Sequence, residues 1–258
     1  MKIKTFSSYL EKIESNPSRN YKVEVLADLF SQLDKEEVKP TMYLLDGRAA
    51  PRYDSLEYNI STNLIKKALE SVSNSDIDEI YNRHGDVGEA AFEIRNLLQE
   101  QDSGMEILEV FKKLLVIAKV SGKGSQEEKV QGIKNIVKSL DPLSAKYISR
   151  MIKGNIRLGL NDKTILDAIS WSKGKDKSMR KLLDRAYGVR SDLGEVAEIA
   201  LGSAPEDLEN LSIEVGLPVA SKLVEREKDT AKIIERLGEC IVQPKYDGLR
   251  AQIHFQRS

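Results

Sequence analysis

Cysteine, long apolar runs and aromatic residues are scarce in this sequence of 258 residues. The single cysteine, Cys240, excludes a disulfide framework and a cysteine-based metal cluster. It also favours a reducing cytosol, so we expect a cytoplasmic protein. The longest plainly apolar run, residues 114–118, is far too short to span a bilayer, and we expect no membrane partner. Aromatic residues at 6% and only 7 prolines favour a helix-rich chain over a β-sandwich or barrel.

An excess of charge of one sign is also lacking, because the formal net charge is only −1. The charges are nevertheless segregated along the chain. Residues 146–190 carry 12 Lys and Arg against 4 Asp and Glu, whereas residues 195–239 carry 5 against 11. This pattern allows a basic face that grips phosphates on a nearly neutral protein. The solvated faces of amphipathic helices would give the same pattern, and that is the alternative.

Apolar residues recur at helical spacing through most of the chain. Start and stop signals separate the expected helices, such as Asn-Pro-Ser at 16–18 and Asp-Pro at 141–142. We expect a mainly α fold, with helices in the ranges 6–13, 23–33, 42–45, 63–72, 75–81, 94–98, 105–120, 129–140, 142–152 and 222–237. Gly-Leu-Pro at 216–218 predicts a domain boundary, with residues 1–216 before it and residues 217–258 after it.

Two stretches of the sequence are similar in their order of turns and apolar positions. Residues 56–65 match residues 156–165, and Asp-Val-Gly-Glu-Ala-Ala at 86–91 matches Asp-Leu-Gly-Glu-Val-Ala at 192–197. We therefore predict a duplicated helical unit, at about 56–98 and 156–201. Chance similarity between capped amphipathic helices is the alternative.

Glycine-bearing turns are candidate phosphate contacts, because glycine lets backbone N–H groups approach a phosphate and a helix N-terminus favours negative charge. The turn at 122–126 combines two glycines with basic and polar side chains. Its candidate contacts are Lys123, Gly124, Ser125 and Gln126. Gly88 and Gly194 open helices in the same manner, while Arg157, beside Gly159, and Arg190 supply cationic partners. A plain linker between helices is the alternative for each turn.

A lysine lies between two segments with strand character near the end of the sequence. Ile241 and Val242 begin an apolar run, Asp-Gly at 247–248 is a tight-turn signal, and apolar residues then alternate with polar ones as far as Phe255. The pattern predicts a β-hairpin with Lys245 on the shoulder of its turn, where an amine could attack phosphorus. An ordinary hairpin with an exposed lysine is the alternative, since so short a pattern has a high false-positive risk.

The longer string Lys-Tyr-Asp-Gly-Leu-Arg at 245–250 resembles the nucleotidyl-lysine motif of ATP-dependent DNA ligases. Gly-Ser-Gln at 124–126 and Arg-Leu-Gly-Leu at 157–160 resemble strings in the N-terminal domain of the archaeal and eukaryotic type of these enzymes. The resemblance covers essentially the whole chain. It implies a duplicated helical DNA-binding domain, followed by a short β-hairpin that begins an adenylation (nucleotidyltransferase) domain.

The same resemblance implies a parent enzyme that seals nicks in double-stranded DNA during replication, repair and recombination. Lys245 would be the catalytic residue that takes AMP from ATP, with Mg²⁺ neutralising phosphate charge, and AMP would then pass to the 5′-phosphate of the nick. Gln243 and Arg250 would contact the nucleotide. Gln243 stands where many members have glutamate, and its amide oxygen can accept the same hydrogen bond. The resemblance also implies a monomer, with a sliding clamp as a candidate partner of the parent protein.

These 258 residues are expected to bind nicked or duplex DNA but neither to seal nicks nor to adenylate themselves. The strands that hold the ribose, metal and triphosphate in such enzymes, and the OB-fold after them, would follow residue 258. One departure from the family is Gly-Leu-Pro-Val-Ala-Ser-Lys-Leu at 216–223, which lacks a second proline and a methionine common in the linker. Two alternatives stay open: a non-catalytic helical DNA- or RNA-binding module, and another lysine nucleotidyltransferase such as an RNA ligase or capping enzyme.

Overall fold

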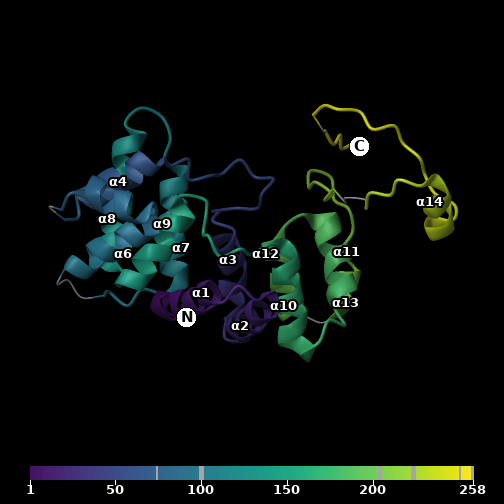
Figure 1. The fold of residues 1–258 in the computed structure, drawn as a ribbon, viewed down its shortest axis with the longest axis horizontal. Helices are drawn as coiled ribbons and strands as arrows, with labels where there is room; N and C mark the ends of the chain where they lie inside the picture. The colour runs from purple at the N-terminus through teal and green to yellow at the C-terminus, as the bar shows by residue number, and fades with distance from the viewer. Residues whose placement is uncertain (74, 99–101, 203–204, 222–224, 250, 257–258) are drawn as a thin grey trace.

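The computed structural model describes residues 1–258 except 74, 99–101, 203–204, 222–224, 250 and 257–258. The described residues form fourteen α-helices and no β-strand, which confirms the expected mainly α fold (Figure 1). None of these helices is long and apolar enough to cross a membrane. The helices are α1 (Ile3–Ser15), α2 (Arg19–Ser31), α3 (Lys35–Leu45), α4 (Thr62–Glu70), α5 (Ile77–His84), α6 (Val87–Leu97), α7 (Ile107–Lys119), α8 (Ser125–Ser139), α9 (Pro142–Ile152), α10 (Asp162–Gly174), α11 (Arg180–Arg190), α12 (Leu193–Gly202), α13 (Pro205–Glu209) and α14 (Thr230–Leu237).

Helices begin where a polar side chain accepts the free N–H groups of the first turn. Ser61 caps α4 and Asn161 caps α10, each by accepting the N–H three residues ahead. Asp141 caps α9 in front of a proline that needs no partner, and Asp86 caps α6. These signals are local in sequence, and the expected starts at 63, 75, 105 and 142 lie within two residues of α4, α5, α7 and α9. The range 42–45 was too short, because α3 begins at Lys35 and contains Pro40.

The first half of the helices (α1 to α6, residues 3–97) packs across the second half (α7 to α12, residues 107–202). Helix α2 packs on α10 and α3 packs on α12, while α4 packs on α8 and α6 packs on α9. Helix α1 contacts α9, and α7 contacts α3, so the first helix of each half contacts the third helix of the other half. Each half thus covers the apolar faces of helices in the other half, so neither half has a complete core without its counterpart.

A single hydrophobic core runs through both halves. Phe6, Leu10 and Ile13 of α1 are completely buried, as are Tyr147 and Met151 of α9. Burial of one large apolar side chain stabilises a fold by about 1.5–3 kcal/mol, and dozens of such side chains fill this core. The loops that leave the core are therefore presented from a well-packed base.

The final helix, α14, is shorter than the sequence pattern suggested. The range 222–237 was expected to be helical, but α14 begins at Thr230 because Asp229 caps it by accepting the N–H of Ala231. Residues 222–224 of that range lie outside the described residues. The apolar side chains of Ile234 and Leu237 are each 60% exposed, so α14 packs little against the helical core.

The β-hairpin expected at 241–255 is not formed among the described residues. Ile241, Leu249 and Phe255, which should have lain on one apolar face, are between 86% and 104% exposed. A two-stranded hairpin is marginal in water unless an apolar face packs on other structure. This segment runs as an irregular chain apart from the helices (Figure 1). It contacts the irregular residues 213–219, where the Gln252 side chain accepts the N–H of Val219 and donates to its carbonyl.

Candidate nucleic-acid interface

Two loops meet near the middle of the molecule: the α3–α4 loop (residues 46–61) and the α9–α10 loop (residues 153–161) (Figure 1). Each begins with a left-handed glycine, Gly47 with a φ of +65° and Gly154 with a φ of +78°. The two backbones approach so closely that a Cβ on Gly47 would lie 3.3 Å from the Cα of Gly154. A cavity of about 490 Å³ lies between the loops, and its charged lining residues are Asp46, Arg48, Arg52, Glu57 and Lys153.

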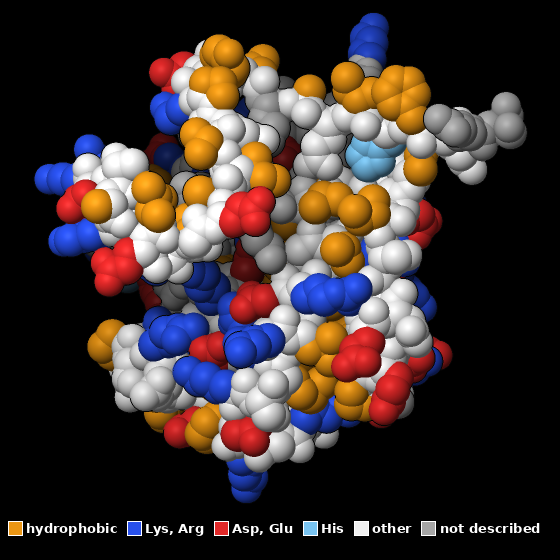
Figure 2. Space-filling view, turned by 90° about the vertical axis from the view of Figure 1, so that its right-hand side faces the viewer, with side chains coloured by type: hydrophobic (Ala, Val, Ile, Leu, Met, Phe, Trp, Pro, Cys, Tyr) orange, Lys and Arg blue, Asp and Glu red, His pale blue; other side chains and the backbone are white. Residues whose placement is uncertain are grey.

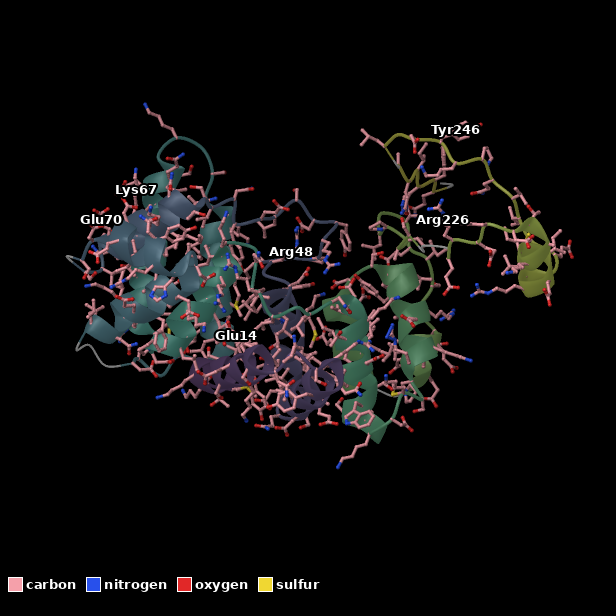
Figure 3. All side chains as sticks on the ribbon, in the orientation of Figure 1. Glu14, Arg48, Lys67, Glu70, Arg226 and Tyr246 are labelled. Carbon is pink, nitrogen blue, oxygen red and sulfur yellow. The ribbon has the colours of Figure 1, made fainter. Side chains whose placement is uncertain are left out.

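The arginines of the α3–α4 loop hold this region together. Arg52 donates to both carboxylate oxygens of Asp46, at 2.8 and 2.6 Å, and to Asp162 at 2.9 Å, so it joins the start of α10 to the end of α3. Arg48, labelled in Figure 3, pairs with Glu57 at 3.1 Å. Sequence reasoning did not single out either arginine, because a loop arginine shows its role only when its distant partners are known.

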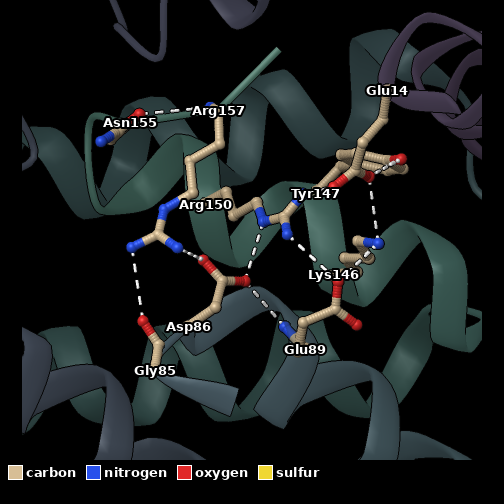
Figure 4. Close-up of polar contacts among 9 residues, drawn as sticks. All are labelled: Glu14, Gly85, Asp86, Glu89, Lys146, Tyr147, Arg150, Asn155 and Arg157. Carbon is tan, nitrogen blue, oxygen red and sulfur yellow. Dashed lines mark hydrogen bonds and ion pairs between the residues drawn. The ribbon is translucent and has the colours of Figure 1, made fainter. Parts of the chain in front are cut away.

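Arg157 in the α9–α10 loop has a left-handed backbone, with a φ of +58°. Its N–H donates to the side chain of Asn155 at 3.2 Å, which fixes the turn. Its guanidinium lies 3.2 Å from Asp86 and donates to the carbonyl of Gly85 at 3.3 Å (Figure 4). The predicted candidate Arg157 is thus tied to the turn just before Gly88, while half of its side chain stays exposed.

A buried ion network lies behind this turn, between α1, α6 and α9 (Figure 4). Arg150 donates to Asp86 at 2.8 Å, to Glu14 at 2.9 Å and to Glu89 at 3.1 Å. Lys146 adds contacts of 3.0 Å to Glu14 and 2.7 Å to Glu89. Since only 4% of the Arg150 side chain is exposed, its charge depends on these carboxylates for compensation. The network fixes the α5–α6 turn against α9.

Glu14 is a carboxylate of this network whose pKa the surroundings shift. Burial, the largest effect, raises its pKa. Hydrogen bonds from Tyr147, Arg150 and Lys146 act in the opposite direction, and together they hold the pKa of Glu14 below its ordinary value. Glu14 therefore stays ionised in the folded protein over the neutral and mildly acidic range.

The α7–α8 loop (residues 120–124) presents the first turn of α8 to solvent. Gly122 and Gly124 both have a φ of +87°, and nothing lies within 4 Å of the positions that a Cβ would take. The Lys123 side chain is exposed and has no hydrogen-bond or ion-pair partner among the described residues. Ser125 and Gln126 follow as the first residues of α8. The N-terminus of a helix next to an exposed ammonium suits an anion, although the N–H of Ser125 already donates to the carbonyl of Gly122.

Gly88 and Gly194 lie in helix contacts, unlike the glycines of the α7–α8 loop. A Cβ on Gly88 would lie 2.7 Å from the carbonyl oxygen of Lys146, and one on Gly194 would lie 2.9 Å from side-chain atoms of Lys39 and Tyr43. Close approach of α6 to α9 and of α12 to α3 accounts for glycine at both positions. A DNA contact by either glycine stays a prediction, and its burial favours a packing role.

Most cations of the basic segment, residues 146–190, already have partners within the protein. Arg180 and Lys177 lie 3.0 and 3.2 Å from the buried carboxylate of Asp167. Arg190, a predicted contact, lies 3.5 Å from Glu195 and is only 14% exposed. Figure 2 shows basic side chains gathered in the middle of one face, with acidic side chains among them. Four exposed lysines of the segment have side chains without a partner among the described residues: Lys153, Lys163, Lys175 and Lys181.

The predicted nucleotide site is not assembled by the described residues. Lys245 is 85% exposed, and Asp247, at 2.6 Å, is its side chain's one polar partner among the described residues. Gln243 is also exposed, and Arg250 lies outside the described residues. Tyr246 marks this segment in Figure 3, apart from the helical core. Within the described ranges, no three or more His, Cys, Asp or Glu side chains form a group that could hold a metal ion.

Known proteins are similar in sequence to this chain over nearly its whole length. Residues 2–170 match the family described as DNA ligase N terminus. The chain is 39% identical to a "Probable DNA ligase" of Dictyoglomus turgidum, over 96% of this chain and 43% of that protein. It is 34% identical to a "DNA ligase" of Sulfurisphaera tokodaii, over 98% of this chain and 45% of that protein. The chain thus spans less than half the length of these relatives, and it belongs to the DNA ligase N-terminus family.

Proposed function

We propose that this chain is the DNA-binding part of an ATP-dependent ligase that seals nicks in duplex DNA through lysyl-AMP and DNA-adenylate intermediates. The family match carries the proposal. The exposed backbone of the α7–α8 and α9–α10 loops supports it, because contacts from loop N–H groups to phosphates hold DNA without reading its sequence. An enzyme that joins nicks at any sequence needs this kind of binding. The family match does not favour a non-catalytic nucleic-acid-binding module.

The α7–α8 loop and the α9–α10 loop are the proposed phosphate contacts. In the first loop and the helix start after it, Lys123 and the backbone at Gly124, Ser125 and Gln126 would face the DNA. In the second, Arg157 and Gly159 would do so, since both are exposed. Gly88, Gly194 and Arg190 complete the proposed set, but two of these are buried and the third is paired with carboxylates. We expect their contribution to come through helix packing and local charge.

The proposed domain division is a helical DNA-binding domain at 1–216 and the start of an adenylation domain at 217–258. The crossed packing of the two halves supports a duplicated unit within the first domain, at about 56–98 and 156–201. In both units the first helix is capped by a polar residue, Ser61 or Asn161, and the last by an aspartate, Asp86 or Asp192. We propose a monomer that uses both units on one duplex.

Lys245 is the proposed acceptor of AMP, with Gln243 and Arg250 beside the nucleotide and Mg²⁺ as the metal. Lys245 is 85% exposed, so the described residues do not supply the surroundings that would hold a nucleotide against its amine. We therefore expect no self-adenylation by these 258 residues. Stable incorporation of labelled AMP at Lys245 in this chain would overturn that expectation.

A binding experiment tests the proposal directly. The purified chain is titrated against a labelled duplex with one central nick, against the intact duplex and against unrelated sequences of equal length. We expect comparable binding for all sequences, and no joined product when ATP and Mg²⁺ are added. Failure to bind any duplex would contradict the proposed function, as would a strong preference for one sequence.

A further inference from the structure

Two lysines, one in each half of the helical region, donate to loop carbonyls of the opposite half. Lys22 of α2 donates through Nζ to the carbonyl of Leu158 in the α9–α10 loop, at 2.7 Å. Lys129 of α8 donates through Nζ to the carbonyl of Tyr58 in the α3–α4 loop, at 2.6 Å. The first contact joins residues 136 positions apart and the second joins residues 71 apart. Neither pairing is visible in the sequence pattern.

The two accepting loops share one backbone feature at these contacts, although Arg157 is also left-handed and Glu57 is not. The residue after each bonded carbonyl is left-handed, Asn59 with a φ of +49° and Gly159 with a φ of +62°. The side chains of Tyr58 and Leu158 are buried, whereas residues 57, 59, 157 and 159 are exposed. Tyr58 and Leu158 therefore point into the core, and the residues on either side of each are exposed to solvent.

The contact that holds the α3–α4 loop requires the charge of Lys129 to be buried, which costs free energy. Lys129 is only 7% exposed, and Tyr58 is the one hydrogen-bond acceptor that its ammonium has among the described residues. A buried ammonium without a carboxylate partner is costly, and a hydrogen bond offsets only part of that cost. Left-handed backbone at Asn59 adds a further small cost. Such features persist where a particular loop conformation is needed.

We propose that Lys22 and Lys129 are positioning residues that hold the α9–α10 and α3–α4 loops in the conformation that receives DNA. The inference rests on the proposed function, because it takes the exposed residues of these loops to face the duplex. The lysines do not touch DNA themselves; each fixes the loop of the other half. The loops differ in charge at equivalent places, with Arg157 in one and Glu57 in the other, so the α9–α10 loop carries the larger share of phosphate contact.

The test uses Lys22→Met and Lys129→Met, which keep most of the length of the side chain and remove its donor. We expect each variant to bind nicked duplex about tenfold more weakly than the unsubstituted chain. A tenfold change corresponds to the free energy of about one hydrogen bond from a charged group. The slope of log K against log salt should stay unchanged. A lysine that touched a phosphate would instead lower that slope by about one, and this result would overturn the inference.

Hydrogen exchange measures the loops without DNA. Lys22→Met should speed amide exchange at residues 156–160 and leave residues 56–60 unchanged, and Lys129→Met should do the reverse. Lys134→Met, on the same helix as Lys129, is the matched control, since its side chain has no partner in the described part of the protein. Unchanged exchange at both loops would also overturn the inference.

The outcomes separate this inference from the proposed function. If the unsubstituted chain of 258 residues binds no DNA, the proposed function fails, while hydrogen exchange still reports on the two lysine contacts. If the unsubstituted chain binds DNA and both variants bind equally well, the function stands and the positioning role fails. Lys129→Met removes a buried donor and could unfold the chain, so Lys22→Met at its half-buried position carries the test in that case.

Discussion

The guanidinium of Arg150 in α9 donates to the carboxylate of Asp86, the residue that caps α6, at 2.8 Å and almost completely buried. This contact joins the two halves of the helical region at the turn that also holds Arg157. It explains how a loop with exposed candidate contacts can be rigid, because the charged groups behind it are fixed by one another and by the surrounding core.

Removal of Arg150 should therefore destabilise the fold strongly. We expect Arg150→Met to lower the free energy of unfolding by about 3–5 kcal/mol, since it leaves buried carboxylates without their partner. Urea denaturation followed by circular dichroism measures the change. Arg83→Met, at a half-exposed arginine that pairs with Glu93, is the control and should cost less than about 1 kcal/mol. A similar small effect at Arg150 would contradict the role given to the network.

The two packed glycines should tolerate alanine to different degrees. A Cβ on Gly88 meets a backbone carbonyl at 2.7 Å, so Gly88→Ala should lower the free energy of unfolding by about 2–3 kcal/mol. Gly194→Ala should cost less, because Lys39 and Tyr43 offer side-chain atoms that can shift. Gly202→Ala in the same helix as Gly194 is the control, since its nearest neighbour would lie 3.7 Å away. Thermal denaturation that ranks Gly88→Ala no worse than Gly202→Ala would exclude the packing role.

Acid should destabilise the protein partly through Glu14. The pKa of Glu14 is lowered in the folded protein, so the unfolded chain binds more protons in acid and stability falls as the pH drops below the ordinary glutamate range. Its contribution is fully present at neutral pH and is lost as the pH falls through the lowered folded-state pKa. Glu14→Gln should be less stable at pH 7 and should show a flatter acid limb of stability against pH. Equal acid limbs for the two proteins would contradict this.

The α7–α8 loop should contact phosphate directly. We expect Lys123→Met to weaken binding to every duplex by a similar factor and to lower the salt slope by about one. Lys4→Met is the control, since Lys4 is exposed on α1 and has no side-chain partner among the described residues. Filter binding at four or five salt concentrations gives both slopes. If Lys123→Met kept the parent slope, the loop would be no more than a linker.

The sequence predicts the helices well because their signals are local. Asp-Pro at 141–142 caps and starts α9, and Gly124 is the N-cap of α8. The crossed packing of the halves, the Arg150 network and the contacts of Lys22 and Lys129 join residues far apart in the chain. Periodicity carries no information about such pairs, so these features required the structure.

The segment around the lysine motif has a local strand pattern that the structure does not form as a strand. Alternation from 249 to 255 is a strand pattern, but a strand forms only when a neighbouring strand and an apolar layer are present to receive it. Ile253 and Phe255 are 79% and 86% exposed, and the residues that this segment contacts, 213–219, form neither a strand nor a packed apolar layer. For Gly88 and Gly194, the sequence correctly marked special positions, but the structure favours helix packing as the cause.

The central claim is that the helical region binds duplex DNA through its phosphates and without reading its sequence. A salt series with this chain and a nicked duplex tests it most directly. The account predicts that log K falls linearly with log salt, with a slope that corresponds to several phosphate contacts and is the same for unrelated sequences. Binding that is absent at low salt, or that does not respond to salt, would contradict it.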